Sequence, residues 1–246
     1  MDFDKDGFEE IKSGIFFYPR EDRGFDRNTT IYRYVNVEYF LPILNNELFV
    51  PARRMFSDLH EHGKHYNPFC YRMMPVGDNP ERYRGIFSRE QAKRENSQWW
   101  LTLCFTMSSP DNYFFWRTYT TDGYGVCYRT TVGQLLDSIK CDDYEVYVGK
   151  IKYCDREYAG HNISEYAFYK TKAYEDENEL RFYFKPKNGV IKDSETFEID
   201  AQSMISEIIL SPFLDPNVRQ DVMRLFKGYY SDYAQRISWS KIIETL

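Results

Sequence analysis

The stretch AYEDENELRFYF, residues 173–184, changes abruptly from acidic to aromatic and apolar side chains. Its second part continues as ELRFYFKP (179–186), which has the composition of a buried strand that a proline ends. Alternate residues of a strand share a face, so we expect Glu177 and Glu179 to point the same way and to repel each other. Two carboxylates at the mouth of a buried strand suit chemistry that stabilises a cation and positions a hydroxyl, whereas a solvated acidic turn is the plainer alternative.

The composition describes a globular chain. Hydrophobic residues make up 42% and charged residues 28% of 246 residues, a length that suits one large domain or two small ones. The net charge of -6 lacks the basic character typical of proteins that bind duplex nucleic acid, although a local basic groove could still form.

Other features concern the compartment of the protein. Five scattered cysteines without a C-x-x-C motif argue against a disulfide framework and a zinc ribbon, and favour a reducing cytoplasm. The acidic start lacks the apolar segment of a signal peptide, and no apolar run approaches the ~20 residues that cross a bilayer. We therefore expect a cytoplasmic location and no contact with a membrane.

The hydrophobic periodicity predicts strands and helices in mixed order. Expected strands cover residues 30–37, 47–52, 99–107, 124–131, 144–153, 179–186, 195–200, 206–212 and 235–240. Expected helices cover residues 37–46, 88–98, 110–120, 132–139, 164–174 and 215–228. These elements neither alternate strictly nor segregate, which favours an α+β fold with a mixed, mainly antiparallel, split sheet flanked by helices over a doubly wound parallel sheet.

The expected domain organisation is simple. Residues 1–29 are charged and dotted with glycine, so we interpret them as an N-terminal arm outside the domain. Residues 30–246 then form a single α+β domain, with a polar, turn-rich insertion at about 53–98.

Three histidines lie in this insertion. His60 and His62 form an H-x-H pair that could ligate zinc from an extended segment, with His65 close by. Because the segment is polar and the chain has only one further histidine, a solvated loop is the better interpretation, and we predict no metal site.

Aromatic residues of the predicted helix over 110–120 are candidates for a binding pocket. Trp116 and Tyr119 stand three residues apart and so share a helix face. Both combine a ring with a polar group, which suits a pocket for a planar ligand, whereas a core-facing aromatic stripe is the alternative and the better interpretation for Phe115.

The pair Glu177 and Glu179, followed by an apolar strand, resembles the E-x-E motif of ADP-ribosyltransferases. The resemblance implies an ADP-ribosyltransferase-like fold and NAD as substrate. It also implies that Glu179 binds the ribose 2′-hydroxyl and stabilises an oxocarbenium ion, while Glu177 orients or deprotonates the acceptor nucleophile.

Enzymes of that superfamily hold NAD with further residues, and the resemblance implies candidates for each. An arginine or histidine of an early strand grips the phosphates or ribose, and the motif YRY (32–34) offers Arg33 with Tyr34 beside it. A hydroxyl motif on a middle strand orders the pocket, and an aromatic ring clamps nicotinamide. The candidates for these two roles are Thr106 and Ser108, and Tyr119, Trp116 or Tyr113.

The chain is also similar to a widespread bacterial and phage family known only as a domain of unknown function, over about residues 30–215. The motifs that carry this similarity are YRY (32–34), FSD (56–58), CFTMS (104–108), WRTY (116–119), GVC (125–127), IKY (151–153), ENELR (177–181) and ISEIILSP (205–212). The family's proline is missing after FSD, and the insertion is longer than the family pattern implies. This similarity implies no activity by itself.

Three hypotheses follow. The first is an NAD-dependent ADP-ribosyltransferase, a toxin or phage-defence effector, which modifies an unidentified macromolecular acceptor (protein, RNA or DNA) and could pair with an antitoxin or inhibitor protein. The second is a non-catalytic module that binds a nucleotide or nucleic acid through its aromatics and through Arg82, Arg84 and Arg89. The third is a purely structural role for the acids, which predicts no pocket near Glu179.

Overall fold

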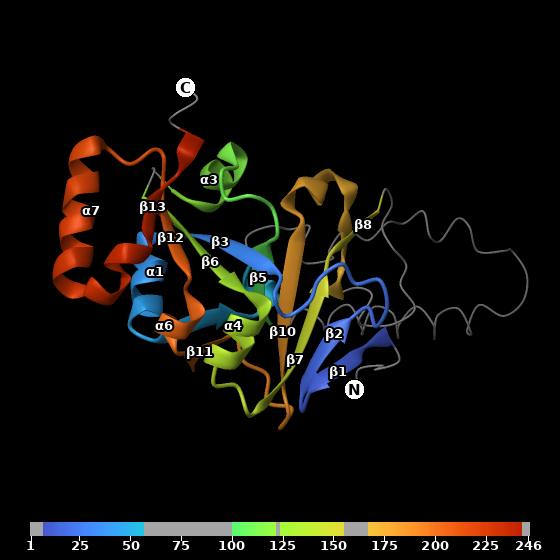
Figure 1. The fold of residues 1–246 in the computed structure, drawn as a ribbon. Helices are drawn as coiled ribbons and strands as arrows, with labels where there is room; N and C mark the ends of the chain where they lie inside the picture. The colour runs from blue at the N-terminus through green and yellow to red at the C-terminus, as the bar shows by residue number, and fades with distance from the viewer. Residues whose placement is uncertain (1–6, 57–99, 122–123, 155–166, 243–246) are drawn as a thin grey trace, which may run out of the picture.

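A computed structural model describes residues 7–56, 100–121, 124–154 and 167–242 (Figure 1). Within these described residues, nine strands form one large sheet. In spatial order they are β1 (Glu9–Lys12), β2 (Ile15–Tyr18), β7 (Tyr144–Lys150), β10 (Glu179–Pro186), β5 (Leu101–Thr106), β3 (Thr30–Asn36), β6 (Gly125–Thr131), β12 (Glu207–Leu210) and β13 (Ile237–Trp239).

Smaller elements surround the sheet. Two short strand pairs are β4 (Glu47–Pro51) with β11 (Ser194–Glu198), and β8 (Lys152–Cys154) with β9 (Tyr169–Thr171). The α-helices are α1 (Val37–Leu44), α3 (Tyr113–Tyr119), α4 (Val132–Ser138), α6 (Ala201–Met204) and α7 (Pro216–Tyr229). Short 3-10 helices are η2 (Arg53–Met55), η5 (Lys172–Glu177) and η6 (Ser231–Arg236).

The pairing of the strands confirms the expected class. Within the large sheet, β2 pairs with β7 and β12 pairs with β13 in parallel, and the other pairs are antiparallel. The protein is therefore an α+β protein with a mixed, mainly antiparallel sheet that helices flank.

Strand β10 lies inside the sheet and has two different faces. Leu180, Phe182 and Phe184 are fully buried in the main core, because every second residue of the strand points to the same side. The residues between them point to the opposite face, where Tyr183 joins a second core cluster. The apolar half of the opening stretch thus builds the centre of the sheet.

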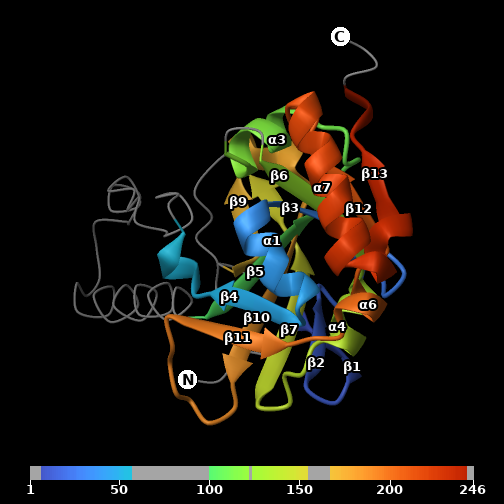
Figure 2. The same ribbon diagram turned by 90° about the vertical axis from the view of Figure 1, so that its left-hand side faces the viewer.

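Helices cover the face that holds the main core. Phe40 of α1, Leu135 of α4, Met204 of α6 and Phe226 of α7 all belong to this core. Figure 2 shows α1, α7 and the β4–β11 pair on the side toward the viewer, in front of the large sheet. Among the described residues, α3 and the segment that precedes β10 pack on the opposite face of the sheet.

The sheet opens between β3 and β5. β3 pairs with β6 along its whole length, from Thr30 opposite Thr131 to Asn36 opposite Gly125. With β5, in contrast, it shares a single pair in the described residues, Tyr32 opposite Thr106. The two strands therefore diverge beyond Tyr32, which leaves space between their side chains.

The N-terminal segment differs from the expected arm over residues 1–29. Its described part contributes β1 and β2 to the large sheet, and Phe16 and Phe17 are buried in different core clusters. Gly14 has a φ of 78°, a conformation that glycine adopts without steric cost, and it forms the turn between the two strands. The run IFFY is short and lies between Gly14 and Pro19, so its strand character is weak in the sequence.

The predicted helix over residues 164–174 is wrong in its described part. Tyr169–Thr171 form β9, and Lys172–Glu177 form the 3-10 helix η5. β9 pairs in parallel with β8, and this pairing outweighs the helical spacing of the apolar residues. The strand expected over residues 144–153 ends at Lys150, after which β8 begins at Lys152.

The insertion at 53–98 lies almost entirely outside the described residues, apart from η2 and Phe56. The same holds for the helix expected near 88–98, for the three histidines and for the arginines of the second hypothesis. The remaining predicted strands and helices are present, with ends that differ by a few residues.

Candidate active site

A cavity of about 440 Å³ lies where β3 and β5 diverge, because both strands contribute to its lining. This volume is in the range of pockets that bind small molecules. Residues of six described helices and strands meet there: Arg33 of β3, Thr106 of β5, Tyr119 of α3, Lys170 of β9, Glu177 of η5 and Glu179 of β10. The hypothesis of a purely structural role predicted no pocket near Glu179, and the cavity contradicts it.

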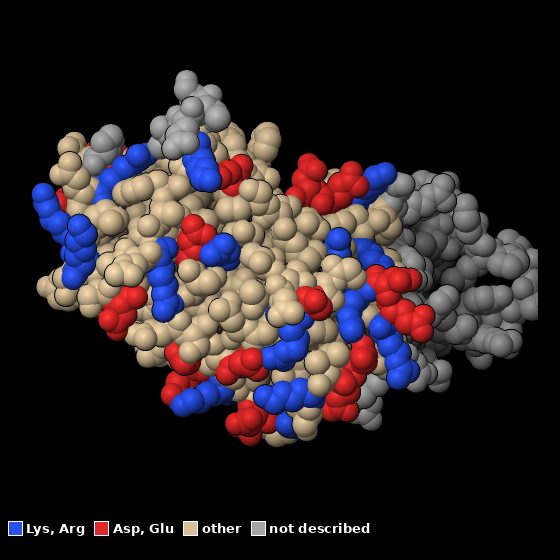
Figure 3. Space-filling view, in the orientation of Figure 1, with Lys and Arg blue, Asp and Glu red and all other residues tan. Residues whose placement is uncertain are grey.

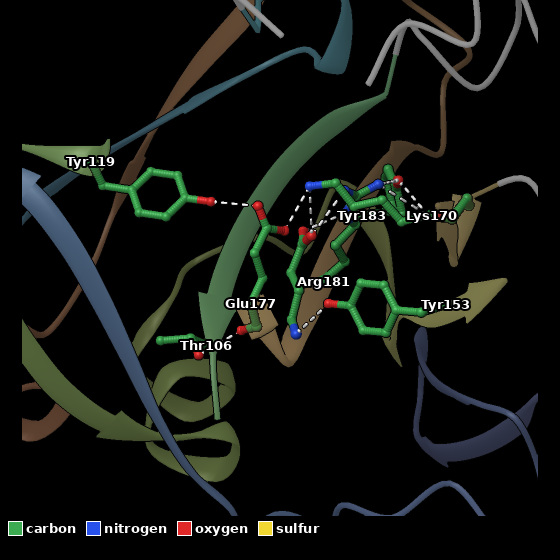
Figure 4. A network of polar contacts seen from close by, with 9 residues as sticks. Thr106, Tyr119, Tyr153, Lys170, Glu177, Arg181 and Tyr183 are labelled. Carbon is green, nitrogen blue, oxygen red and sulfur yellow. Dashed lines mark hydrogen bonds and ion pairs between the residues drawn. The ribbon is translucent and has the colours of Figure 1, made fainter. Parts of the chain in front are cut away.

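Glu177 is held at both carboxylate oxygens (Figure 4). The hydroxyl of Tyr119 donates to its Oε1 at 2.8 Å, and the ammonium of Lys170 donates to its Oε2 at 2.7 Å. The side chain of Lys170 is only 10% exposed and that of Glu177 only 16% exposed. This ion pair is therefore shielded from water. In such a buried environment the attraction between two charges is stronger than on the surface.

Glu179 has a different set of partners. Arg181 donates from Nε to its Oε1 at 2.5 Å and from a terminal nitrogen to its Oε2 at 3.0 Å. Lys170 lies 3.5 Å from the same Oε2. Both Glu179 and Arg181 are buried, and burial of a charge is tolerated only where an opposite charge compensates it.

A tight turn between the two glutamates directs both into the cavity. Asn178 adopts a left-handed conformation, with φ of 42° and ψ of 52°, and ends η5. Thr106 fixes the turn, because its hydroxyl donates to the carbonyl of Glu177 at 2.7 Å and accepts from the amide of Ser108 at 3.0 Å. The backbone amide of Glu179 donates to the hydroxyl of Tyr153 at 2.9 Å, so the start of β10 is anchored on both sides.

The environment perturbs the ionisation of Glu177 and Tyr119. Burial raises the pKa of Glu177, and the nearby charge of Glu179 adds to that rise, whereas Lys170 and the hydrogen bond from Tyr119 oppose it. Burial and the neighbouring carboxylate of Glu177 raise the pKa of Tyr119. Tyr119 therefore remains a proton donor, and Glu177 takes up a proton more readily than an ordinary glutamate.

Arg33 of β3 also lines the cavity and carries a positive charge. Its side chain is half-buried and forms no salt bridge with any residue of the described ranges. It lies near Tyr128, whose pKa is raised by burial and lowered in part by the charge of Arg33. An arginine that lines a cavity and has no carboxylate partner among the described residues is suited to bind an anionic ligand, because its guanidinium is planar and always charged.

The structure brings most of the predicted site residues together. Arg33, Tyr34, Thr106, Tyr119, Glu177 and Glu179 all line the cavity. The hydroxyl of Tyr34 donates to the carbonyl of Pro110 at 2.6 Å. This hydrogen bond fixes the loop before α3, so the hydroxyl already has a partner within the protein.

Ser108, Trp116 and Tyr113 do not line the cavity in the described part of the chain. Trp116 is fully buried and packs edge-on against Tyr34, with ring centroids 4.9 Å apart. Tyr113 instead contacts Phe213, with centroids 5.4 Å apart. Of the three aromatic candidates for nicotinamide, Tyr119 alone among the described residues has its ring at the cavity.

Three important residues had no assigned role in the sequence: Lys170, Arg181 and Tyr153. Alternation along β10 could have indicated Arg181, because it stands two residues after Glu179 and so shares its face. Lys170 was placed in a predicted helix, and its position beside both glutamates follows only from the pairing of β9 with β8.

Among the helices of the described ranges, none combines the length and the apolar character that a membrane span requires. In comparisons with known proteins, no family model matches the chain and no curated protein matches it significantly.

Proposed function

We propose that the protein is an NAD-dependent ADP-ribosyltransferase, which cleaves NAD and transfers ADP-ribose to a nucleophilic acceptor. One observation carries the proposal: Arg33, Tyr119 and the pair Glu177 and Glu179 come from distant segments and line the same cavity. The cavity thus combines a cation for phosphates, an aromatic ring for a base and two carboxylates for a sugar. The opening of the sheet at this point agrees with the split sheet that the resemblance implies, and the ADP-ribosyltransferase-like fold is part of the proposal.

In this proposal NAD binds across the opening between β3 and β5. Arg33 donates two parallel hydrogen bonds to the phosphate oxygens, as a guanidinium does with anions of this shape. The ring of Tyr119, which is 45% exposed, stacks on nicotinamide. Glu179 accepts a hydrogen bond from a ribose hydroxyl.

The chemical step separates the ribose from nicotinamide. The bond between C1′ and the pyridinium nitrogen breaks, and its electron pair stays on that nitrogen, so neutral nicotinamide leaves. The positive charge that develops on the ribose is stabilised by the carboxylate of Glu179. A lone pair of the acceptor then forms a bond to C1′, and the acceptor's proton passes to Glu177.

The acceptor is a macromolecule in this proposal, either protein, RNA or DNA, and the biological role is that of a toxin or phage-defence effector. On the face in Figure 3, acidic and basic side chains of the described residues lie interspersed. Such a surface favours none of these acceptor classes through its charge alone.

A binding module without catalysis is the second candidate. Lys170 and Arg181 compensate the charges of Glu177 and Glu179, so the cavity does not repel phosphate groups and could hold a nucleotide that is never cleaved. Such a module would bind NAD without releasing nicotinamide.

The proposal is tested by incubating purified protein with NAD and measuring free nicotinamide. Glu179→Gln removes the stabilising charge and is expected to reduce nicotinamide release about 100-fold or more. Glu198→Gln is the matched control, because Glu198 is exposed and pairs with Lys140 on the surface, away from the cavity.

Circular dichroism and thermal unfolding check that the Glu179→Gln variant is folded. Full nicotinamide release by this folded variant contradicts the proposal. Binding of NAD by the unmodified protein, without any release of nicotinamide, supports the binding module instead.

A further inference from the structure

We propose that Arg181 is a positioning residue that keeps Glu179 ionised and fixed in place, and thereby leaves Glu177 as the glutamate that exchanges protons. The catalytic meaning of this division rests on the proposed function. The division itself concerns the two carboxylates and can be measured without NAD.

Arg181, labelled in Figure 4, is held in place by contacts besides those to Glu179. Its side chain is fully buried, and one terminal nitrogen donates to the carbonyl of Ala167 at 3.4 Å and to the hydroxyl of Tyr183 at 3.3 Å. The hydroxyl of Tyr183 donates to the same carbonyl at 2.8 Å. Because these contacts hold the guanidinium from behind, its other two nitrogens are presented to Glu179 in a fixed orientation.

The partners of the two glutamates are unequal. Glu179 receives two hydrogen bonds from a guanidinium and lies near a second cation, Lys170. Glu177 receives one hydrogen bond from Lys170 and one from the neutral hydroxyl of Tyr119. A guanidinium stabilises a carboxylate anion more than a phenol does, so the arrangement favours the charge on Glu179. Pairs of carboxylates in unequal environments commonly divide acid–base roles in this way.

Other groups also surround Glu179 and must be considered. Lys170 approaches from β9, Tyr153 from β8 and Glu177 from η5. Tyr119 approaches from α3, and Cys104 of β5 stands opposite Arg181 in the strand register. All of these groups are retained in a variant that changes Arg181 alone, so a change in the titration of Glu179 is then due to Arg181.

The experiment compares Arg181→Met, Arg181→Lys and a control, Lys185→Met. Lys185 lies on the same strand and the same face as Arg181 and pairs with Glu145 at 3.5 Å, so its removal tests the loss of a similar ion pair away from Glu179. Carbon NMR of protein labelled at the glutamate carboxyl carbons follows the titration of Glu179, whose signal is assigned by its absence in Glu179→Gln.

We expect Arg181→Met to move the midpoint of the Glu179 titration to higher pH by about one unit or more, because a neighbouring arginine stabilises a carboxylate by that amount. Arg181→Lys keeps the charge but loses the two-point contact. Its Glu179 midpoint should therefore lie between those of the unmodified protein and Arg181→Met. Lys185→Met leaves the midpoint unchanged. If Arg181→Met does not fold, Arg181→Lys and Lys170→Met must each shift the midpoint upward.

The outcomes separate this inference from the proposed function. An unchanged Glu179 midpoint in folded Arg181→Met protein overturns the inference, even if NAD is cleaved. A shifted midpoint in a protein that never releases nicotinamide supports the inference and contradicts the proposed function. If the acid limb of nicotinamide release moves together with the Glu179 midpoint, both are supported.

Discussion

The role of Arg33 leads to the most direct prediction about NAD binding. Arg33 lines the cavity, is half-buried and has no carboxylate partner in the described residues, so an anionic ligand pairs with it without breaking a salt bridge of these residues. Arg33→Ala should therefore weaken NAD binding. Arg33→Lys should recover only part of the loss, because an ammonium cannot donate two parallel hydrogen bonds to a phosphate.

The magnitude follows from the kind of contact. A hydrogen bond to a charged group contributes about 1.5–3 kcal/mol, and each 1.4 kcal/mol changes affinity tenfold. Loss of the Arg33 contact should thus weaken NAD binding about 10-fold to 100-fold. Isothermal titration calorimetry in a Glu179→Gln background measures this change, because NAD is then consumed about 100-fold more slowly during the titration.

The matched control is Arg27→Ala. Arg27 pairs with Asp137 on the surface at 2.7 Å, and exposed pairs of this kind contribute little to stability. We expect this variant to bind NAD as its parent does. If Arg33→Ala also binds NAD as tightly as its parent, Arg33 does not hold the phosphates and the assignment of the cavity to NAD is wrong.

Two further predictions concern the proton acceptor and the core. Tyr119→Phe removes a hydrogen bond that lowers the pKa of Glu177, so that pKa rises, and the acid limb of ADP-ribose transfer should move to higher pH in a pH–rate profile. An unmoved limb contradicts Glu177 as the group that takes the acceptor's proton. Phe182→Ala removes a fully buried ring from the middle of β10 and should reduce the free energy of unfolding in urea by about 3–5 kcal/mol. A loss of less than about 1 kcal/mol would contradict its place in the core.

The strands and helices that the sequence predicted correctly carry strong local signals. The strand over residues 179–186 combines aromatic residues with a terminal proline and is present with those bounds. Helix α7 begins as expected, because Asp215 caps it and accepts from the amide of Asn217, and a proline occupies its first position.

The errors arose where long-range pairing decides the structure. The run IFFY joins the centre of the large sheet through its pairing with β7, and the segment around Lys170 becomes β9 through its pairing with β8. Neither partner is close enough in sequence to leave a local pattern. The cation beside both glutamates was missed for this reason.

The candidate site was predicted in part. The E-x-E spacing and the early arginine identified Glu177, Glu179 and Arg33, which share one cavity. Trp116 and Tyr119 stand three residues apart, which on a helix separates them by about 60°. That rotation is enough to bury Trp116 completely while Tyr119 reaches the cavity, and only the packing of α3 determines which ring is outside.

The near absence of backbone pairing between β3 and β5 makes the large sheet two halves joined along a weak seam. Arg33 belongs to one half and Glu179 to the other. A dinucleotide that contacts both residues would tie the halves together, so its binding should slow amide hydrogen exchange on both sides of the seam and raise the melting temperature. The cavity would then lie at the most weakly paired position of the sheet, and a bound dinucleotide would replace the missing backbone hydrogen bonds between the two halves.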